Sequence, residues 1–151
     1  MPHSFTKLTV HCIFAVKGRQ AMIDAELRER LYGYIGGIVR ESGGCLSAIG
    51  GTTDHVHLLI DLPAPMSVAE MMRVVKANSS KWIRETFPDQ ASFAWQTGYG
   101  AFAVSLSAVE EVREYIRHQE EHHRKRTFEE EFLDFIQRHG LKYDARYLWD
   151  D

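Results

Sequence analysis

At 151 residues, with 44% hydrophobic and 26% charged residues, the chain has the size and composition of one ordinary globular domain. Its formal net charge of -3 argues against a strongly basic nucleic-acid-binding protein but does not settle the partner, because short basic runs remain. The sequence has neither a recognisable signal peptide nor an apolar run near the roughly 20 residues of a membrane span, so we expect a cytoplasmic protein without a membrane partner.

The first half of the chain predicts a strand, a helix and a hairpin. Residues 5–18 alternate and are rich in β-formers, which indicates a strand. Asp24 is placed to cap a helix whose apolar residues recur every three or four positions. Residues 45–51 and 52–62 then predict two strands, so close in sequence that a hairpin is expected. Cys12 and Cys45 are both expected to be small buried residues.

A second helix is predicted to begin at Ser67 and to continue through the run ANSS (77–80). Residues 93–105 predict an interrupted strand, because Gly98 and Gly100 mark a turn or bulge.

The tyrosine-bearing third helix is predicted over 107–123, where Ser107 and Glu110 form a capping-box pattern. A short helix ending at Gly140 follows. The order β-α-β-β-α-β followed by helices predicts an α+β, ferredoxin-like fold. Its antiparallel sheet has helices on one face and an open second face, with the C-terminal tyrosine helix and tail in addition.

His55 and His57 occur in TTDHVHLLID (52–61), which otherwise resembles a buried strand. Because side chains alternate along a strand, both imidazoles face the open side of the sheet, about 7 Å apart at their Cα atoms. Two such histidines can bind one divalent metal ion if another element supplies a third ligand. A His-x-His pattern taken alone favours the alternative, in which the two residues are hydrogen-bonded surface histidines without a metal.

Tyr115 and Gln119 lie four positions apart in the predicted third helix and therefore share a face. A phenol and an amide oxygen could approach the metal together from this face. Val109, Val112 and Ile116 form an adjoining apolar stripe that is expected to dock the helix. Taken alone, Tyr115 also fits a half-buried packing role.

Three motifs carry a family resemblance: DHVHLLI (54–60), WQTGYGAFAVS (95–105) and VREYIRHQ (112–119). In order and spacing they resemble the single-tyrosine transposases of the His-hydrophobic-His (HUH) nuclease superfamily. These enzymes serve insertion sequences that move as single-stranded DNA, and the REP-associated tyrosine transposases are related to them. The resemblance covers nearly the whole chain, from the opening strand HCIFAVKGR (11–19) into the tail.

The resemblance implies that His55, His57 and Gln119 hold Mg²⁺ or Mn²⁺, and that Tyr115 attacks the scissile phosphate. The products are a 5′-phosphotyrosine and a free 3′-hydroxyl, and the covalent link lets another 3′-hydroxyl reseal the strand without ATP. Imidazole ligands favour Zn²⁺ or Mn²⁺ over Mg²⁺, so the sequence does not name the ion. Asp54 could orient a ligand histidine, with an ordinary turn aspartate as the alternative.

The resemblance also implies a homodimer that acts on single-stranded, hairpin-bearing DNA, in which the tyrosine helix of one subunit can serve the histidine pair of the other. Residues 1–126 are expected to form the catalytic domain, and residues 127–151 a helical tail packed on it. Two basic groups could bind DNA phosphates, although a solvated surface explains each equally well. They are Arg73, Lys76, Lys81 and Arg84 in the second helix, and Arg124, Lys125 and Arg126 after the third.

Two other classes of enzyme that use paired histidines on phosphates are excluded by the residues of this chain. A histidine-triad hydrolase needs a third alternating histidine where this chain has Leu59, and the paired His-x-Thr/Ser elements of two-histidine phosphodiesterases are missing. A non-catalytic hairpin-binding protein remains the alternative, because RNA-recognition modules use a similar sheet with exposed aromatic residues. Such a module gives no reason for a histidine pair, a tyrosine and a glutamine to occur together. We therefore expect a metal-dependent enzyme that cleaves and rejoins single-stranded DNA.

Overall fold

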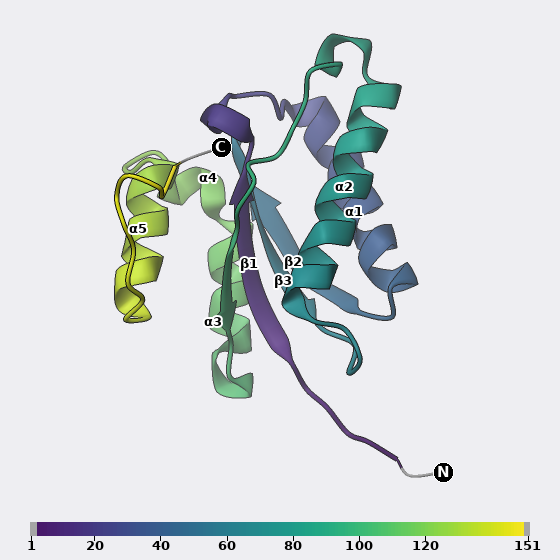
Figure 1. Ribbon diagram of the computed structural model, residues 1–151, viewed down its shortest axis with the longest axis vertical. Coiled ribbons are helices and arrows are strands. Elements are labelled where there is room, and N and C mark those ends of the chain that lie inside the picture. Colours follow the sequence, from purple (N-terminus) through teal and green to yellow (C-terminus); the bar gives the residue numbers. More distant parts are fainter. Residues whose placement is uncertain (1–2, 150–151) are drawn as a thin grey trace.

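A four-stranded antiparallel sheet lies between two groups of helices in the computed structural model, which describes residues 3–149 (Figure 1). The strands β1 (Thr9–Ala15), β2 (Cys45–Gly51), β3 (His55–Asp61) and β4 (Gly100–Ala103) pair in the order β2-β3-β1-β4. The helices are α1 (Ala25–Glu41), α2 (Val68–Thr86), α3 (Val109–Arg117), α4 (Gln119–His122) and α5 (Phe128–Arg138). The predicted ferredoxin-like α+β fold is confirmed.

Both long helices begin where the sequence predicted. Asp24 and Ser67 each accept a hydrogen bond from the backbone N–H three residues further on, at 2.8 and 3.1 Å. The run ANSS continues α2 because Ser79 faces the core, where its hydroxyl accepts a hydrogen bond from the Trp95 indole at 2.9 Å. α1 and α2 together cover one face of the sheet (Figure 1).

The two faces of β3 differ in chemistry, as its alternation predicted. Val56, Leu58 and Ile60 are fully buried in the main core beneath α1 and α2. His55 and His57 point to the opposite face. Since β3 is an inner strand that pairs with both β1 and β2, its backbone is held on both sides. The histidine pair therefore sits on a rigid support.

The histidine face is not open, and that part of the prediction was wrong. α3 packs on it through Ile116, which contacts Ala48 and Leu59 of the sheet. α5 covers the rest of this face with a stripe of residues spaced four apart that packs against β1 and β4: Phe128, Phe132 and Ile136. Figure 1 shows α3, α4 and α5 together on the side of the sheet opposite α1 and α2. The histidine pair is therefore buried by this chain's own C-terminal segment.

The predicted single helix over 107–123 is two helices. At His118 the backbone leaves the helical region (φ -107°, ψ 31°), so α3 ends before it and α4 begins after it. The predicted capping box is also wrong, because a 3-10 turn over Leu106–Ala108 precedes α3 and Glu110 pairs with Arg113 instead. The break changes the direction of the chain just before Gln119.

The structure also bears on the expectations for the cysteines, the membrane and the domain boundaries. The prediction that both cysteines are buried was right for Cys12 and wrong for Cys45, which is exposed at the start of β2. Within residues 3–149, none of the helices is both long and apolar enough to cross a membrane. The expected catalytic domain (1–126) and tail (127–151) each extend two residues beyond the described part of the chain.

Candidate active site and metal centre

His55 and His57 lie side by side and have no solvent-exposed surface. Their ring centroids are 5.2 Å apart, and the ring of Tyr115 lies 5.8 Å from that of His57. The structure therefore brings the predicted nucleophile to the predicted histidine pair within one chain. The surface-histidine alternative is contradicted by their complete burial.

A polar group supports the outer nitrogen of each histidine. Asp54 Oδ1 lies 2.7 Å from His55 Nδ1, and Thr52 donates a hydrogen bond to the same carboxylate at 3.0 Å. Burial alone would raise the pKa of Asp54, but its interactions with His55, Thr52 and His123 together outweigh burial and lower the pKa. Asp54 thus lies where a carboxylate that orients His55 is expected.

The partner of His57 is His11 of β1, which the sequence did not single out. His11 Nε2 lies 2.8 Å from His57 Nδ1. Burial lowers the pKa of His11 to about 3 and that of His57 to about 4, although Glu131 opposes the shift at His57. Both rings are therefore uncharged at neutral pH, which is the state in which an imidazole binds a metal.

Gln119 reaches the pair from the start of α4 and is almost fully buried. Its Oε1 lies 3.1 Å from His55 Nε2, and its Nε2 donates to the Tyr115 carbonyl oxygen at 3.3 Å. The hydrogen bond to the Tyr115 carbonyl spans the break at His118. The structure thus brings together all four residues that were predicted to form the centre of the site.

Two further side chains complete the cluster, and the sequence reasoning missed both. Glu131 of α5 is fully buried, and its Oε1 lies 2.9 Å from His57 Nε2, 3.0 Å from His123 Nε2 and 3.6 Å from His55 Nε2. One ligand atom from each of these four residues lies within 4.8 Å of every other. This buried cluster of three histidines and one glutamate could hold a metal ion.

The signal for Glu131 was present but weak. It occurs in the acidic run EEE (129–131), and such runs usually form a solvated face. However, it lies three positions after Phe128 and four before Phe135, on the apolar side of its helix. His123 lies in the basic run HHRKR (122–126), which favours phosphate binding through its arginines and lysine and gives no sign of a metal ligand.

The other oxygen of Glu131 faces the nucleophile. The Tyr115 hydroxyl donates a hydrogen bond to Glu131 Oε2 and accepts one from Arg126 Nη2 at 2.8 Å. Burial and the adjacent Glu131 carboxylate raise the pKa of Tyr115. Burial would also raise the pKa of Glu131, but hydrogen bonds from His123 and His57 outweigh it and lower the pKa, so this carboxylate is ionised.

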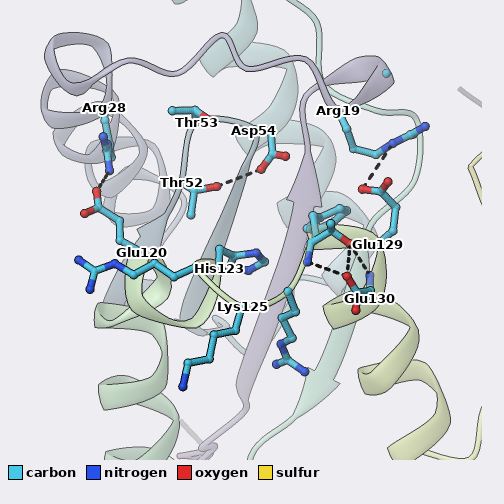
Figure 2. A pocket seen from close by; sticks show the side chains of 15 residues that line it. Arg19, Arg28, Thr52, Thr53, Asp54, Glu120, His123, Lys125, Glu129 and Glu130 are labelled. Atoms are coloured by element: carbon cyan, nitrogen blue, oxygen red, sulfur yellow. Dashed lines mark hydrogen bonds and ion pairs between the residues drawn. The ribbon is translucent and has the colours of Figure 1, made fainter.

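A hollow of about 940 Å³ opens beside the cluster (Figure 2). Thr52, Asp54 and His123 line it, so it borders the site directly. Arg124, Lys125 and Arg126, one of the two predicted DNA-binding groups, also line it. Neither Arg124 nor Lys125 takes part in an ion pair within residues 3–149, whereas Arg28 pairs with Glu120 across the rim.

The second predicted DNA-binding group lies in α2, on the other side of the sheet from the histidine pair. Lys76 donates hydrogen bonds to the carbonyls of Thr97 and Gly98, and Arg84 to that of Phe93, so these two side chains hold the segment before β4. Arg73 and Lys81 are exposed. The structure does not bring this group to the candidate site.

Residues 4–119 match the family model of IS200-like transposases. The chain belongs to this family. The match includes the histidine pair, Tyr115 and Gln119, and it confirms the resemblance to single-tyrosine transposases that the motifs indicated. It ends before His123 and Glu131, so this IS200-like chain completes its buried cluster with residues beyond the matched part.

Known transposases resemble the chain in sequence, and solved structures share its fold. The IS200 transposases of Salmonella typhimurium and Salmonella typhi are each 25% identical over 124 residues, which is 79% of this chain and 81% of theirs. A candidate transposase from Deinococcus radiodurans R1 has a similar fold (TM-score 0.64, 23% identity, 77% of this chain and 93% of that one). So does a REP-associated tyrosine transposase bound to a REP hairpin (TM-score 0.57, 15% identity, 77% and 68%).

Proposed function

We propose that this IS200-like transposase cleaves and rejoins single-stranded DNA in a metal-dependent reaction, through a 5′-phosphotyrosine formed on Tyr115. The observation that carries the proposal is the position of the Tyr115 hydroxyl, which is hydrogen-bonded to the buried carboxylate that also contacts His57. A nucleophile and a cluster of metal-binding side chains at one point are what phosphoryl transfer requires.

The donor atoms at the site fit a divalent metal ion. His55, His57 and Gln119 are the proposed ligands, since two ring nitrogens and an amide oxygen converge there in a buried setting. A bound ion would polarise the scissile phosphate and neutralise charge in the transition state. Asp54 and His11 would hold the two rings in place through their outer nitrogens.

The chain's own groups account for the remaining steps. The Tyr115 oxygen bonds to phosphorus as the bond from phosphorus to the 3′-oxygen breaks, and the released 3′-oxygen takes up a proton from water. Glu131 Oε2 holds the phenol in place by accepting its hydrogen bond, and the phenol proton passes to water as the bond to phosphorus forms. Arg126 donates to the same phenol oxygen and would stabilise negative charge on it as the proton leaves.

The hollow beside the cluster is the proposed path of the single strand. Arg124, Lys125 and Arg126 line it and would contact phosphates next to the scissile one. The α2 group of Arg73, Lys76, Lys81 and Arg84 would bind a separate part of the DNA, such as a hairpin stem, because it lies on the other side of the sheet.

Two earlier expectations remain part of the proposal. The family resemblance implies a homodimer, and light scattering of the purified chain would measure its mass. The expected location is the cytoplasm. Tyr115 lies beside the histidine pair of its own chain, so an exchange of tyrosine helices between subunits is not needed to assemble the site.

The test incubates the protein with single-stranded oligonucleotides from the DNA that flanks its gene, in Mn²⁺ or Mg²⁺. A denaturing gel should resolve a covalent protein–DNA adduct that is lost with Tyr115→Phe and with a chelator. Tyr147→Phe is the matched control, since Tyr147 is 64% exposed and its ring packs against Arg146, which is not part of the cluster, and it should leave the adduct unchanged. Tight hairpin binding without an adduct would instead support the non-catalytic alternative.

A further inference from the structure

We propose that the segment after Gln119 is a ligand arm, in which His123 and Glu131 bind the same metal ion as His55 and His57. The completed site binds first-row transition ions such as Mn²⁺ and Zn²⁺ in strong preference to Mg²⁺. This rests on the proposed function only in taking the buried cluster as the metal site. It adds two ligands and an ion class that the family match, which ends at residue 119, does not provide.

The separations of Glu131 Oε1 from the three histidine nitrogens are close to those of ligands around one ion. Atoms bound to a metal at about 2.1 Å lie roughly 3.0 to 3.4 Å from their neighbours in the common coordination geometries. Glu131 Oε1 lies 2.9 Å from His57 Nε2, 3.0 Å from His123 Nε2 and 3.6 Å from His55 Nε2. Each histidine presents the same nitrogen to this point.

The carboxylate of Glu131 is the buried negative charge at this point. An ionised carboxylate without solvent exposure is costly unless charges or hydrogen bonds compensate it. Glu131 has hydrogen bonds with Tyr115, His57 and His123, and Arg126 forms an ion pair with its Oε2 at 3.8 Å. A divalent cation at Oε1 would take the place of the two histidine hydrogen bonds there, and the nitrogens that make them would become its ligands.

The arm is built to present these two residues at a fixed place. Thr127 and Glu130 form a reciprocal capping box at the start of α5, which fixes the first turn of that helix. The apolar stripe of α5 packs on β1 and β4, so Glu131 enters the site from an anchored helix. His123 is held by its backbone N–H, which donates to the Gln119 carbonyl at 3.0 Å.

The chemistry of the donors predicts the ion. Mg²⁺ prefers oxygen ligands and gives up water reluctantly, whereas imidazole nitrogens suit Zn²⁺ and neighbouring transition ions. With Gln119, the set has three nitrogens, one amide oxygen and one carboxylate oxygen, and the three nitrogens disfavour Mg²⁺. Since Glu131 belongs to α5, binding of the ion must also strengthen the docking of α5 on the sheet.

The experiment uses the full chain without DNA, after a chelator has stripped any metal and has itself been removed. Calorimetry then measures the binding of Mn²⁺, Zn²⁺ and Mg²⁺. Glu131→Gln and His123→Asn should each weaken Mn²⁺ binding by more than about tenfold, since even loss of an outer supporting group costs that much. Glu130→Gln and His118→Asn are the matched controls and should change it less than twofold. Gln preserves the capping box, and His118 is exposed.

Hydrogen exchange supplies a second measurement. Mn²⁺ should slow exchange of the α5 amides in the wild type but not in Glu131→Gln. If Glu131→Gln fails to fold, two measurements still test the proposal: the affinity of the wild type for Mn²⁺ relative to Mg²⁺, and the affinity of His123→Asn for Mn²⁺.

Equal affinity of wild type for Mg²⁺ and Mn²⁺, or wild-type Mn²⁺ affinity in both ligand variants, would overturn the proposal. Because no DNA is present, these outcomes are independent of whether the protein forms a DNA adduct.

Discussion

Gly50 of β2 controls how closely the tyrosine helix can approach the sheet. A Cβ at this position would overlap the carbonyl oxygen of Ile116 and lie 2.9 Å from its carbonyl carbon. Carbon atoms in good contact are about 3.5 to 4.0 Å apart, so Gly50→Ala must push α3 away by about 1 Å. Ile116 adjoins Tyr115, and Gly50 pairs with His57 across the sheet. The displacement therefore falls between the nucleophile and the histidine pair.

A misplacement of 1 Å at a reacting group can lower a rate by about 100-fold. We expect Gly50→Ala to reduce the rate of adduct formation by that order, and overpacking to lower the free energy of unfolding by about 1 to 3 kcal/mol. A time course of the covalent adduct and urea unfolding measure the two effects. Gly98→Ala is the control, because a Cβ there meets nothing within 4 Å. An adduct rate for Gly50→Ala within threefold of wild type would refute the close docking of α3.

Three further predictions follow from the surroundings of the site. In the metal-free protein His11 and His57 have lowered pKa values, of about 3 and about 4. The unfolded chain therefore binds more protons below pH 6.5, and urea titrations should show the free energy of unfolding falling from pH 6.5 to 5 by about 2 kcal/mol for each histidine. A flat profile would contradict their burial as neutral rings. His11→Ala should weaken Mn²⁺ binding in calorimetry about 10- to 100-fold by releasing His57, while unchanged affinity would assign His11 to packing alone. Lys125→Ala should reduce the salt dependence of single-strand binding, measured by fluorescence anisotropy, by about 0.7 in the slope of log K against log salt, and Lys142→Ala should not.

Local signals carried much of the fold and the centre of the site. Asp24 and Ser67 cap their helices because capping depends on a side chain and an amide three residues apart. His55 and His57 share a face because side chains alternate along any strand. Tyr115 and Gln119 remain close even across the unpredicted break at His118, because one side chain still reaches the carbonyl of the other.

Local signals also failed where competing contacts decided the outcome. Ser107 and Glu110 fit a capping box, yet a 3-10 turn precedes α3 and Glu110 pairs with Arg113. The second face of the sheet was expected to be open, as in a ferredoxin-like fold. The sequence of the tail did not show that α5 would pack on this face and cover it.

The amino-acid sequence by itself determined the order of the strands and helices, the shared face of the two histidines and the family, since all three depend on patterns of nearby residues. Only the tertiary structure decided that His11, His123 and Glu131 join them. Glu131 meets His57 across 74 positions of sequence. That contact exists because the apolar stripe of α5 packs on β1 and β4 and turns one member of an ordinary acidic run inward. No local pattern encodes such a meeting, because it depends on where a separate helix docks.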